Sequence, residues 1–141
     1  FSRFVMGRLG RDPAFFRYVK GSVAERILAR TRYALTALDP ALGHEIKKTR
    51  PALVIQNDVT NRYGMTTIVA AITSRVNAPP YPNEVVVQPI GTGLDVPSTV
   101  RLDQIRTVDR QRLIKRIGKV DAAAMNRVDE AIKISLGLVR I

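Results

Sequence analysis

Polar side chains that could do chemistry gather in one short stretch, GHEIKKTRPALVIQND, from Gly43 to Asp58. The chain's single histidine, His44, and a glutamate, Glu45, stand just before three cations and a proline. The apolar run Ala52–Ile55 follows at once and is typical of a buried strand. Because Arg50 stands where the polar loop enters this strand, we expect rigid structure to hold its guanidinium in place.

Several kinds of catalytic site are excluded by what the sequence lacks. It has no cysteine, which excludes disulfides, thiol catalysis and thiolate metal sites, and one histidine cannot build a multi-histidine metal site. No glycine-rich phosphate loop, dinucleotide fingerprint or acidic pair typical of a two-metal nuclease is present. We therefore expect no metal and no cofactor. Catalysis would have to use Arg, Thr, Glu and the one His, in a reaction that depends on charge stabilisation.

The charge of the chain indicates a polyanionic partner. The 141 residues carry a formal net charge of +11, of which residues 1–32 contribute +6 (eight Lys/Arg against two acids) and residues 33–141 contribute +5. Such a basic chain is expected to meet RNA, DNA, acidic lipid or an acidic protein. No apolar run approaches the ~20 residues that span a bilayer. With the absence of cysteine, this favours a cytoplasmic protein without a membrane partner.

Composition divides the chain into two parts. Residues 1–32 are rich in Arg and aromatic side chains, and we expect a basic N-terminal extension that is poorly ordered or helical, because Ser22 and Glu25 have capping-box spacing. Residues 33–141 have the composition of one folded domain. The local pattern alone would continue a helix through Tyr33–Leu38.

Short apolar and β-branched runs predict a β-rich domain that ends in one helix. We expect Pro51 to begin the first clear strand and Asn57, Asp58 and Asn61 to mark turns. A capped helix should follow Asp121, with one apolar stripe made by Met125, Val128, Ile132 and Leu136. Such an order predicts a small curled antiparallel sheet or barrel with the helix packed on it. The expected strands are residues 52–56, 66–73 (TTIVAAIT, buried on both faces), 84–88, 99–102, 105–108 and 113–120.

Three ordered blocks of the chain resemble one known family. KTRPALVIQNDVTNRYGMTTIVAAIT, DQIRTVDRQRL and MNRVDEAIKISLGL are similar to the MazF/PemK toxins of bacterial toxin–antitoxin systems, and the likeness covers about residues 38–138. It implies a mainly β fold, an SH3-like antiparallel β-barrel with a C-terminal α-helix, and a homodimer. It further implies a metal-independent, sequence-selective endoribonuclease for single-stranded RNA, inhibited by an antitoxin with an acidic C-terminal segment. Alignment to this family makes Tyr33–Leu38 the first strand.

The resemblance also implies a catalytic set. Arg50 aligns with the family's catalytic arginine, and we assign it to phosphate stabilisation, with proton delivery as a second role open to it. Thr73 aligns with the catalytic threonine, whose hydroxyl can donate to a phosphate oxygen. Glu45 aligns with a loop glutamate that could accept the 2′-hydroxyl proton. The ordinary alternatives are a surface salt bridge for Arg50, a strand-end residue for Thr73 and a solvated charge or a partner of Arg50 for Glu45.

Further side chains near these positions are expected to bind RNA. The two lysines should hold the RNA backbone, with an affinity that falls as salt rises, and the tyrosine should stack on a base or pack its loop. Gln104 should read a base or brace the site, and Arg75 and Asn77 should contact flanking nucleotides. His44 could stack on a base, face solvent or share the acid–base work. The predicted RNA-binding residues are His44, Lys47, Lys48, Arg75, Asn77, Tyr81 and Gln104.

Two other functions stay open at the level of sequence. Gyrase-poisoning toxins of the CcdB type share this architecture and depend on a C-terminal Trp-Gly-Ile, whereas this chain ends LVRI and has no tryptophan. The composition also permits a nucleic-acid-binding module without catalysis, one disabled by its unusual N-terminus.

Overall fold

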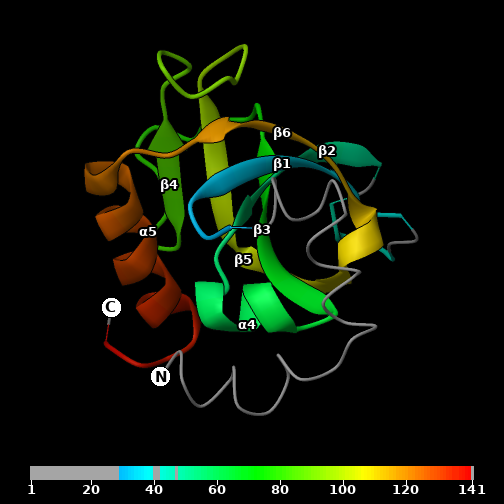
Figure 1. Cartoon of the computed structure of the whole chain (residues 1–141). Helices are drawn as coiled ribbons and strands as arrows, with labels where there is room; N and C mark the ends of the chain where they lie inside the picture. The colour runs from blue at the N-terminus through cyan, green and yellow to red at the C-terminus, as the bar shows by residue number, and fades with distance from the viewer. Residues whose placement is uncertain (1–28, 40–41, 47, 141) are drawn as a thin grey trace.

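The computed structural model describes residues 29–39, 42–46 and 48–140, which form one curled sheet with a long helix against it (Figure 1). The strands dominate, as the sequence predicts. In chain order the elements are β1 (Arg32–Ala37), β2 (Thr49–Val54), α4 (Asp58–Tyr63), β3 (Thr66–Thr73), β4 (Glu84–Val87), β5 (Ser98–Asp109), the 3₁₀ helix η1 (Arg110–Arg112), β6 (Leu113–Lys119) and α5 (Ala122–Ser135).

All six strands belong to one sheet, in the order β4-β5-β3-β2-β1-β6, and every neighbouring pair is antiparallel. The mainly β fold with a C-terminal helix is therefore confirmed. The sheet curls strongly (Figure 1), but β4 and β6 are its two edges and do not pair, so the expected barrel is not closed. The family-based first strand is also confirmed, because β1 runs through Arg32–Ala37 instead of continuing a helix.

The central strands are buried on both faces. Successive side chains of a strand point to opposite faces of the sheet, and each face has its own apolar cluster. On one face Tyr33, Leu53 and Ile72 join the helix residues Met125 and Val128 in the larger core. The opposite face has a second, smaller cluster made by Ala34, Ala52, Val54, Val69, Val108 and Leu113. This two-sided burial was predicted from the almost uniformly apolar sequence of β3, and it shows that β2 and β3 are packed on both sides along most of their length.

Helix α5 begins and ends where the sequence indicates. The Asp121 side chain accepts a hydrogen bond from the Ala124 amide, which caps the first turn. Gly137 has φ of +73°, the left-handed conformation typical just beyond a helix end. The helix lies beside β4 and β5 (Figure 1). The predicted stripe is only partly right, since Leu136 lies at the C-cap and is 61% exposed.

Three local predictions are wrong. Strand β2 begins at Thr49, so Pro51 lies within it, opposite Leu35 of β1. The expected turn residues form helix α4, whose N-cap Asn57 accepts a hydrogen bond from Thr60 N. The two short strands predicted around Asp103-Gln104 are one strand, β5, which bulges there because Ala70 pairs with Ile105 while Ala71 pairs with Arg101.

Some predictions lie outside the described residues. The capping-box helix at Ser22 and Glu25 and most of the N-terminal extension fall within residues 1–28, and Lys47 also falls outside the described ranges. Within those ranges, no helix has the length and apolar character needed to cross a membrane.

Candidate active site

Two of the three predicted catalytic residues lie together at the ends of β2 and β3. The register pairs Ala52 with Ala71 and Val54 with Val69, and the same register continued by two residues sets Arg50 opposite Thr73. Both side chains line one pocket of about 380 Å³. Two strands buried on both faces therefore bring a guanidinium and a hydroxyl to the same opening, which is the rigid support expected for Arg50.

The hydroxyl of Thr73 is oriented by the chain that follows it. Its Oγ1 accepts a hydrogen bond from the Arg75 amide over 3.2 Å. A threonine oxygen that accepts in this way keeps its own hydrogen for donation. Thr73 is half-buried at the strand end, so this hydrogen can point to a phosphate oxygen held in the pocket.

The other walls of the pocket contain groups that the sequence analysis missed. Ser74 follows Thr73 directly, and Asp95 comes from the connection between β4 and β5. Lys48, which was predicted to bind RNA, lines the same pocket, so two cations and one carboxylate share it. No local signal points to Asp95, because only the return of that connection to the ends of β2 and β3 brings it there.

A close backbone contact supports the connection that carries Asp95. A Cβ atom on Gly118 of β6 would lie 1.6 Å from the Thr92 carbonyl oxygen, and one on Gly93 would lie 2.2 Å from the Ile117 carbonyl oxygen. Only glycine allows the connection and the strand to approach so closely. Gly118 therefore helps to set the position of one wall of the pocket.

The third predicted catalytic residue, Glu45, does not line this pocket. It is exposed on the β1–β2 loop, where its Oε1 accepts a hydrogen bond from the Leu42 amide over 3.1 Å. His44 is exposed beside it. Gln104 of β5 binds this loop with both ends of its amide: Nε2 donates to the His44 carbonyl oxygen and Oε1 accepts from the Ile46 amide, each over 3.3 Å. Gln104 was expected either to read a base or to brace the site, and these two contacts are of the bracing kind.

Two arginines hold the chain where it leaves β1 for the same loop. Arg106 Nη1 donates to the Leu38 carbonyl oxygen over 2.6 Å. Arg112 Nη1 donates to the carbonyl oxygen of Ala37 over 3.1 Å and also to that of Asp39. Loop and strand are thus tied to β5 and η1 by side chains that the sequence analysis did not single out.

The β3–β4 loop carries the remaining predicted RNA-binding residues. Arg75 and Tyr81 are exposed, and Tyr81 keeps 64% of its surface accessible. The Asn77 amide is instead used within the protein, because its Nδ2 lies 3.1 Å from both carboxylate oxygens of Glu84. Arg75 and Tyr81 therefore present a cation and an aromatic ring on the loop that begins right after Thr73.

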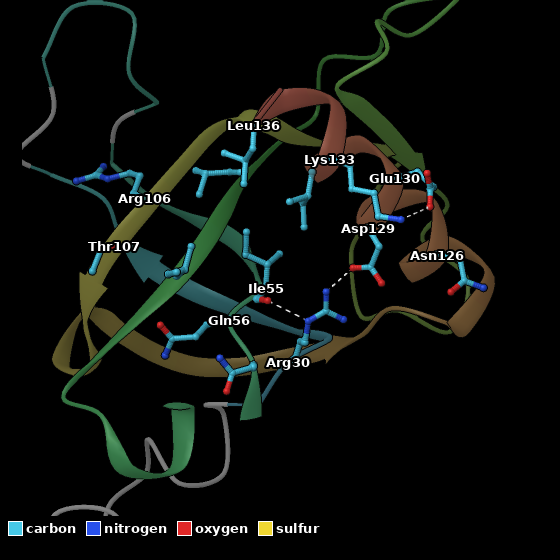
Figure 2. Close-up of a pocket in the computed structure, with 14 residues that line it drawn as sticks. Arg30, Ile55, Gln56, Arg106, Thr107, Asn126, Asp129, Glu130, Lys133 and Leu136 are labelled. Atoms are coloured by element: carbon cyan, nitrogen blue, oxygen red, sulfur yellow. Dashed lines mark hydrogen bonds and ion pairs between the residues drawn. The ribbon is translucent and has the colours of Figure 1, made fainter. Parts of the chain in front are cut away.

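A larger pocket of about 840 Å³ lies elsewhere, between α5 and the strands β3 and β5 (Figure 2). Its floor is apolar, and on its rim Arg30 Nε donates to the Ile55 carbonyl oxygen over 2.9 Å while the guanidinium pairs with Asp129. None of the predicted site residues that the structure describes lines it. We take the smaller pocket as the candidate active site, because it contains the guanidinium and the hydroxyl.

In the described part of the chain, no three side chains among His, Asp and Glu are grouped as metal ligands. Among the described carboxyl groups, Asp103 has a clearly shifted pKa, and it lies outside the candidate pocket. The guanidinium of Arg101, 2.6 and 2.7 Å from the Asp103 carboxylate, lowers the pKa of that carboxyl.

Comparisons with known proteins show the family of the chain. Residues 33–136 match the sequence family described as PemK-like, MazF-like toxins of type II toxin–antitoxin systems. The chain is 44% identical over 102 residues to the endoribonuclease EndoA of Bacillus subtilis, a match that covers 72% of this chain and 88% of that protein. Among solved structures it resembles MazF of Deinococcus radiodurans (26% identity, TM-score 0.67, 79% of this chain and 97% of the other). It also resembles the Mycobacterium tuberculosis toxin MazF-mt6 (28%, 0.65, 77% and 99%). By sequence over most of its length, the chain belongs to the PemK/MazF-like family of toxins of type II toxin–antitoxin systems.

Proposed function

We propose that this toxin is an endoribonuclease that cuts single-stranded RNA, including mRNA, at selected sequences and without a metal ion. The observation that carries the proposal is the meeting of Arg50 and Thr73 in one pocket at the ends of two rigid strands. The similarity to a relative named as an endoribonuclease supports it. RNA contains its own nucleophile, so an enzyme that positions the phosphate and stabilises its charge can cut it.

In the proposed reaction the RNA is cut by its own 2′-hydroxyl. The 2′-oxygen attacks the adjacent phosphorus, the bond from phosphorus to the 5′-oxygen breaks, and the products are a 2′,3′-cyclic phosphate and a 5′-hydroxyl. Arg50 offsets the charge on the phosphoryl oxygens, and Thr73 donates a hydrogen bond to one of them. We assign the 2′-proton to Glu45, which lies outside the pocket on the β1–β2 loop and would have to come within hydrogen-bond reach of the 2′-oxygen to accept it. The leaving 5′-oxygen takes a proton from the Arg50 guanidinium or from water.

Binding of the RNA chain would use the exposed cations and ring around the pocket. Lys48 and Arg75 would contact phosphates, and Tyr81 would stack on a base. Lys47 and His44 would contribute from the β1–β2 loop. The net charge of +11 suits both RNA and the acidic C-terminal segment of a cognate antitoxin. We further propose that the toxin is a homodimer and acts in the cytoplasm, and that residues 1–32 form an extension to a toxin domain of residues 33–141. The end of this extension is joined to the domain, since Arg30 contacts Ile55 and Asp129 and Arg32 belongs to β1.

The test compares Arg50→Ala and Thr73→Val with wild type on single-stranded RNA in EDTA. We expect wild type to cut and each variant to lose at least about 10²-fold in kcat, as when one donor to a transition-state oxyanion is removed. Thr66→Val makes the same change at the exposed, opposite end of β3, and Arg127→Ala removes an exposed arginine from α5, so both controls should cut normally. Mass spectrometry of the cut RNA should find the cyclic phosphate and the 5′-hydroxyl, and sequencing of the cut ends should give the preferred cut sequence.

The outcomes separate the proposal from its rivals. Equal cutting by wild type and Arg50→Ala, or loss of cutting in EDTA, would contradict the assignment. RNA binding with no cutting by any of the proteins would favour the module without catalysis. Inhibition of gyrase without RNA cleavage would favour a toxin of the CcdB type.

A further inference from the structure

A buried carboxylate stands at the start of β4, just behind the β3–β4 loop. Glu84 is 8% exposed, and its Oε1 accepts a hydrogen bond from the Tyr81 amide over 2.8 Å. Both of its carboxylate oxygens lie 3.1 Å from Asn77 Nδ2. The Glu84 amide in turn donates to the Tyr81 carbonyl oxygen over 2.9 Å. Burial of a carboxylate costs free energy unless the group is hydrogen-bonded. The buried position of Glu84 therefore depends on the loop shape that supplies these donors, and the loop shape depends on Glu84.

Arg101 forms an ion pair with Glu84 that is longer than its contacts with Asp103. Arg101 lies opposite Glu84 in the β4–β5 ladder, and its Nε is 3.7 Å from Glu84 Oε2. The same guanidinium makes two shorter bonds, of 2.7 and 2.6 Å, to Asp103. Arg101 is therefore oriented mainly by Asp103, and the short hydrogen bonds to the Glu84 carboxylate come from Asn77 and Tyr81 of the loop.

The first turn of this loop is anchored as well, next to the candidate active site. The Arg75 amide donates to Thr73 Oγ1 over 3.2 Å, and Thr99 Oγ1 donates to the Arg75 carbonyl oxygen over 2.7 Å. The loop is thus fixed at its beginning by two threonines and at its end by Glu84. Between these anchors the side chains of Arg75 and Tyr81 remain exposed.

We infer that Glu84 is a positioning residue for RNA recognition. It holds the β3–β4 loop in the shape that presents Arg75 and Tyr81 to the nucleotides that flank the cut phosphate. Glu84 does not touch RNA; it acts through the Asn77 side chain and the Tyr81 backbone. The base preference of cleavage therefore depends on a carboxylate that is buried under the recognition loop. This inference rests on the proposed ribonuclease function.

The test uses Glu84→Gln and Asn77→Ala in the full chain. Glutamine keeps the shape of Glu84, but its NH₂ group would face the Tyr81 amide or the Asn77 NH₂ group, which are donors themselves. Asn77→Ala removes the side-chain donor that binds both carboxylate oxygens of Glu84. Glu130→Gln makes the matched change on the exposed face of α5, where Glu130 pairs only with Lys133 in the described part of the chain. The substrate is a pool of single-stranded RNA with randomised nucleotides on both sides of a cut site.

For Glu84→Gln and Asn77→Ala we expect the ratio of kcat/KM between the best and the average flanking sequence to fall by about tenfold, the effect of losing about 1.4 kcal/mol of discrimination. The loss should lie in KM, with kcat on saturating RNA within about threefold of wild type, because Arg50 and Thr73 stay in place. Glu130→Gln should keep the wild-type preference. A lower melting temperature with unchanged preference, or an equal loss on every sequence, would overturn the inference.

A second readout separates this inference from the proposed function. The same RNA pool is bound to Arg50→Ala protein with and without Glu84→Gln, so that no cleavage is needed. If no protein cuts RNA but Glu84→Gln still broadens the bound sequences, the ribonuclease proposal fails and the positioning role stands. If cutting is normal and the bound sequences are the same with either residue at position 84, the positioning role fails.

Discussion

Replacement of Tyr33 by phenylalanine should make the protein more resistant to alkali. Tyr33 of β1 is fully buried, and in the described part of the chain its hydroxyl has no hydrogen-bond partner. Burial, with a smaller effect from the charge of Asp121, raises the pKa of Tyr33 from 10.0 to about 12. The folded state therefore holds this proton more tightly than the unfolded state, and its stabilising effect is complete below pH 10 and lost as the pH rises through 12.

The size of the effect follows from the two pKa values. A rise from 10.0 to about 12 corresponds to about 2.7 kcal/mol of unfolding free energy lost across this range in wild type. Tyr33→Phe cannot lose it. Near neutral pH the variant should be as stable as wild type or more stable by about 1 kcal/mol, because a buried hydroxyl without a partner is removed.

Urea unfolding of both proteins, followed by circular dichroism from about pH 7 to about pH 11.5, measures the difference directly. Because both proteins share every other titrating group, those contributions cancel in the comparison. The advantage of Tyr33→Phe should widen steadily above about pH 10. Parallel stability curves over the whole range, or a loss of more than about 1 kcal/mol near pH 7, would refute the reasoning.

Three further predictions concern the surroundings of the site. Gly118→Ala should cost at least about 2 kcal/mol in urea unfolding, because its methyl group would meet the Thr92 carbonyl oxygen; normal stability would contradict the contact. Asp103→Asn should lower stability by up to about 1 kcal/mol at neutral pH. Because the hydrogen bond from Arg101 lowers the pKa of Asp103, this difference should persist through the ordinary aspartate range and be lost only as the pH falls through the lowered pKa. A constant difference at all pH values would exclude this cause. Asp95→Asn should tighten RNA binding at low salt, measured by titration of labelled RNA, because a carboxylate leaves a pocket lined by cations; weaker binding would show that Asp95 itself contacts RNA.

The strands and the final helix could be predicted from the sequence because their signals are local. The apolar run of β3 and the capped helix after Asp121 depend on neighbouring residues only. Helix α4 could not be read in the same way, because Asn57, Asp58 and Asn61 suit turns and helix ends equally well. Helix α4 is stabilised by a contact with strand β3: the Oδ1 of Asn61 accepts a buried hydrogen bond from Thr67 Oγ1 over 2.7 Å.

Some residues of the candidate site could be predicted from the sequence, and others could not. Arg50 and Thr73 were predicted from the family resemblance, because an arginine at a strand start and a threonine at a strand end are not distinctive by themselves. The antiparallel register of β2 and β3 then places the two residues at neighbouring strand ends. The roles of Gln104, Asn77 and Glu84 could not be predicted, because each depends on which backbone group lies opposite it in the fold. A glutamine that reads a base and a glutamine that braces a loop have the same sequence signature.

The residues assigned to chemistry and those assigned to base recognition lie on different parts of the fold. The groups assigned to chemistry lie on strands buried on both faces, where a change of backbone shape would disturb the core. The groups assigned to base recognition lie on loops held by a few side-chain hydrogen bonds, among them those of Glu84 in one loop and Gln104 in the other. A change at either support can reshape a loop while Arg50 and Thr73 stay in place. Base preference can therefore change independently of the cutting reaction, and the comparison of KM with kcat in Glu84→Gln tests that separation.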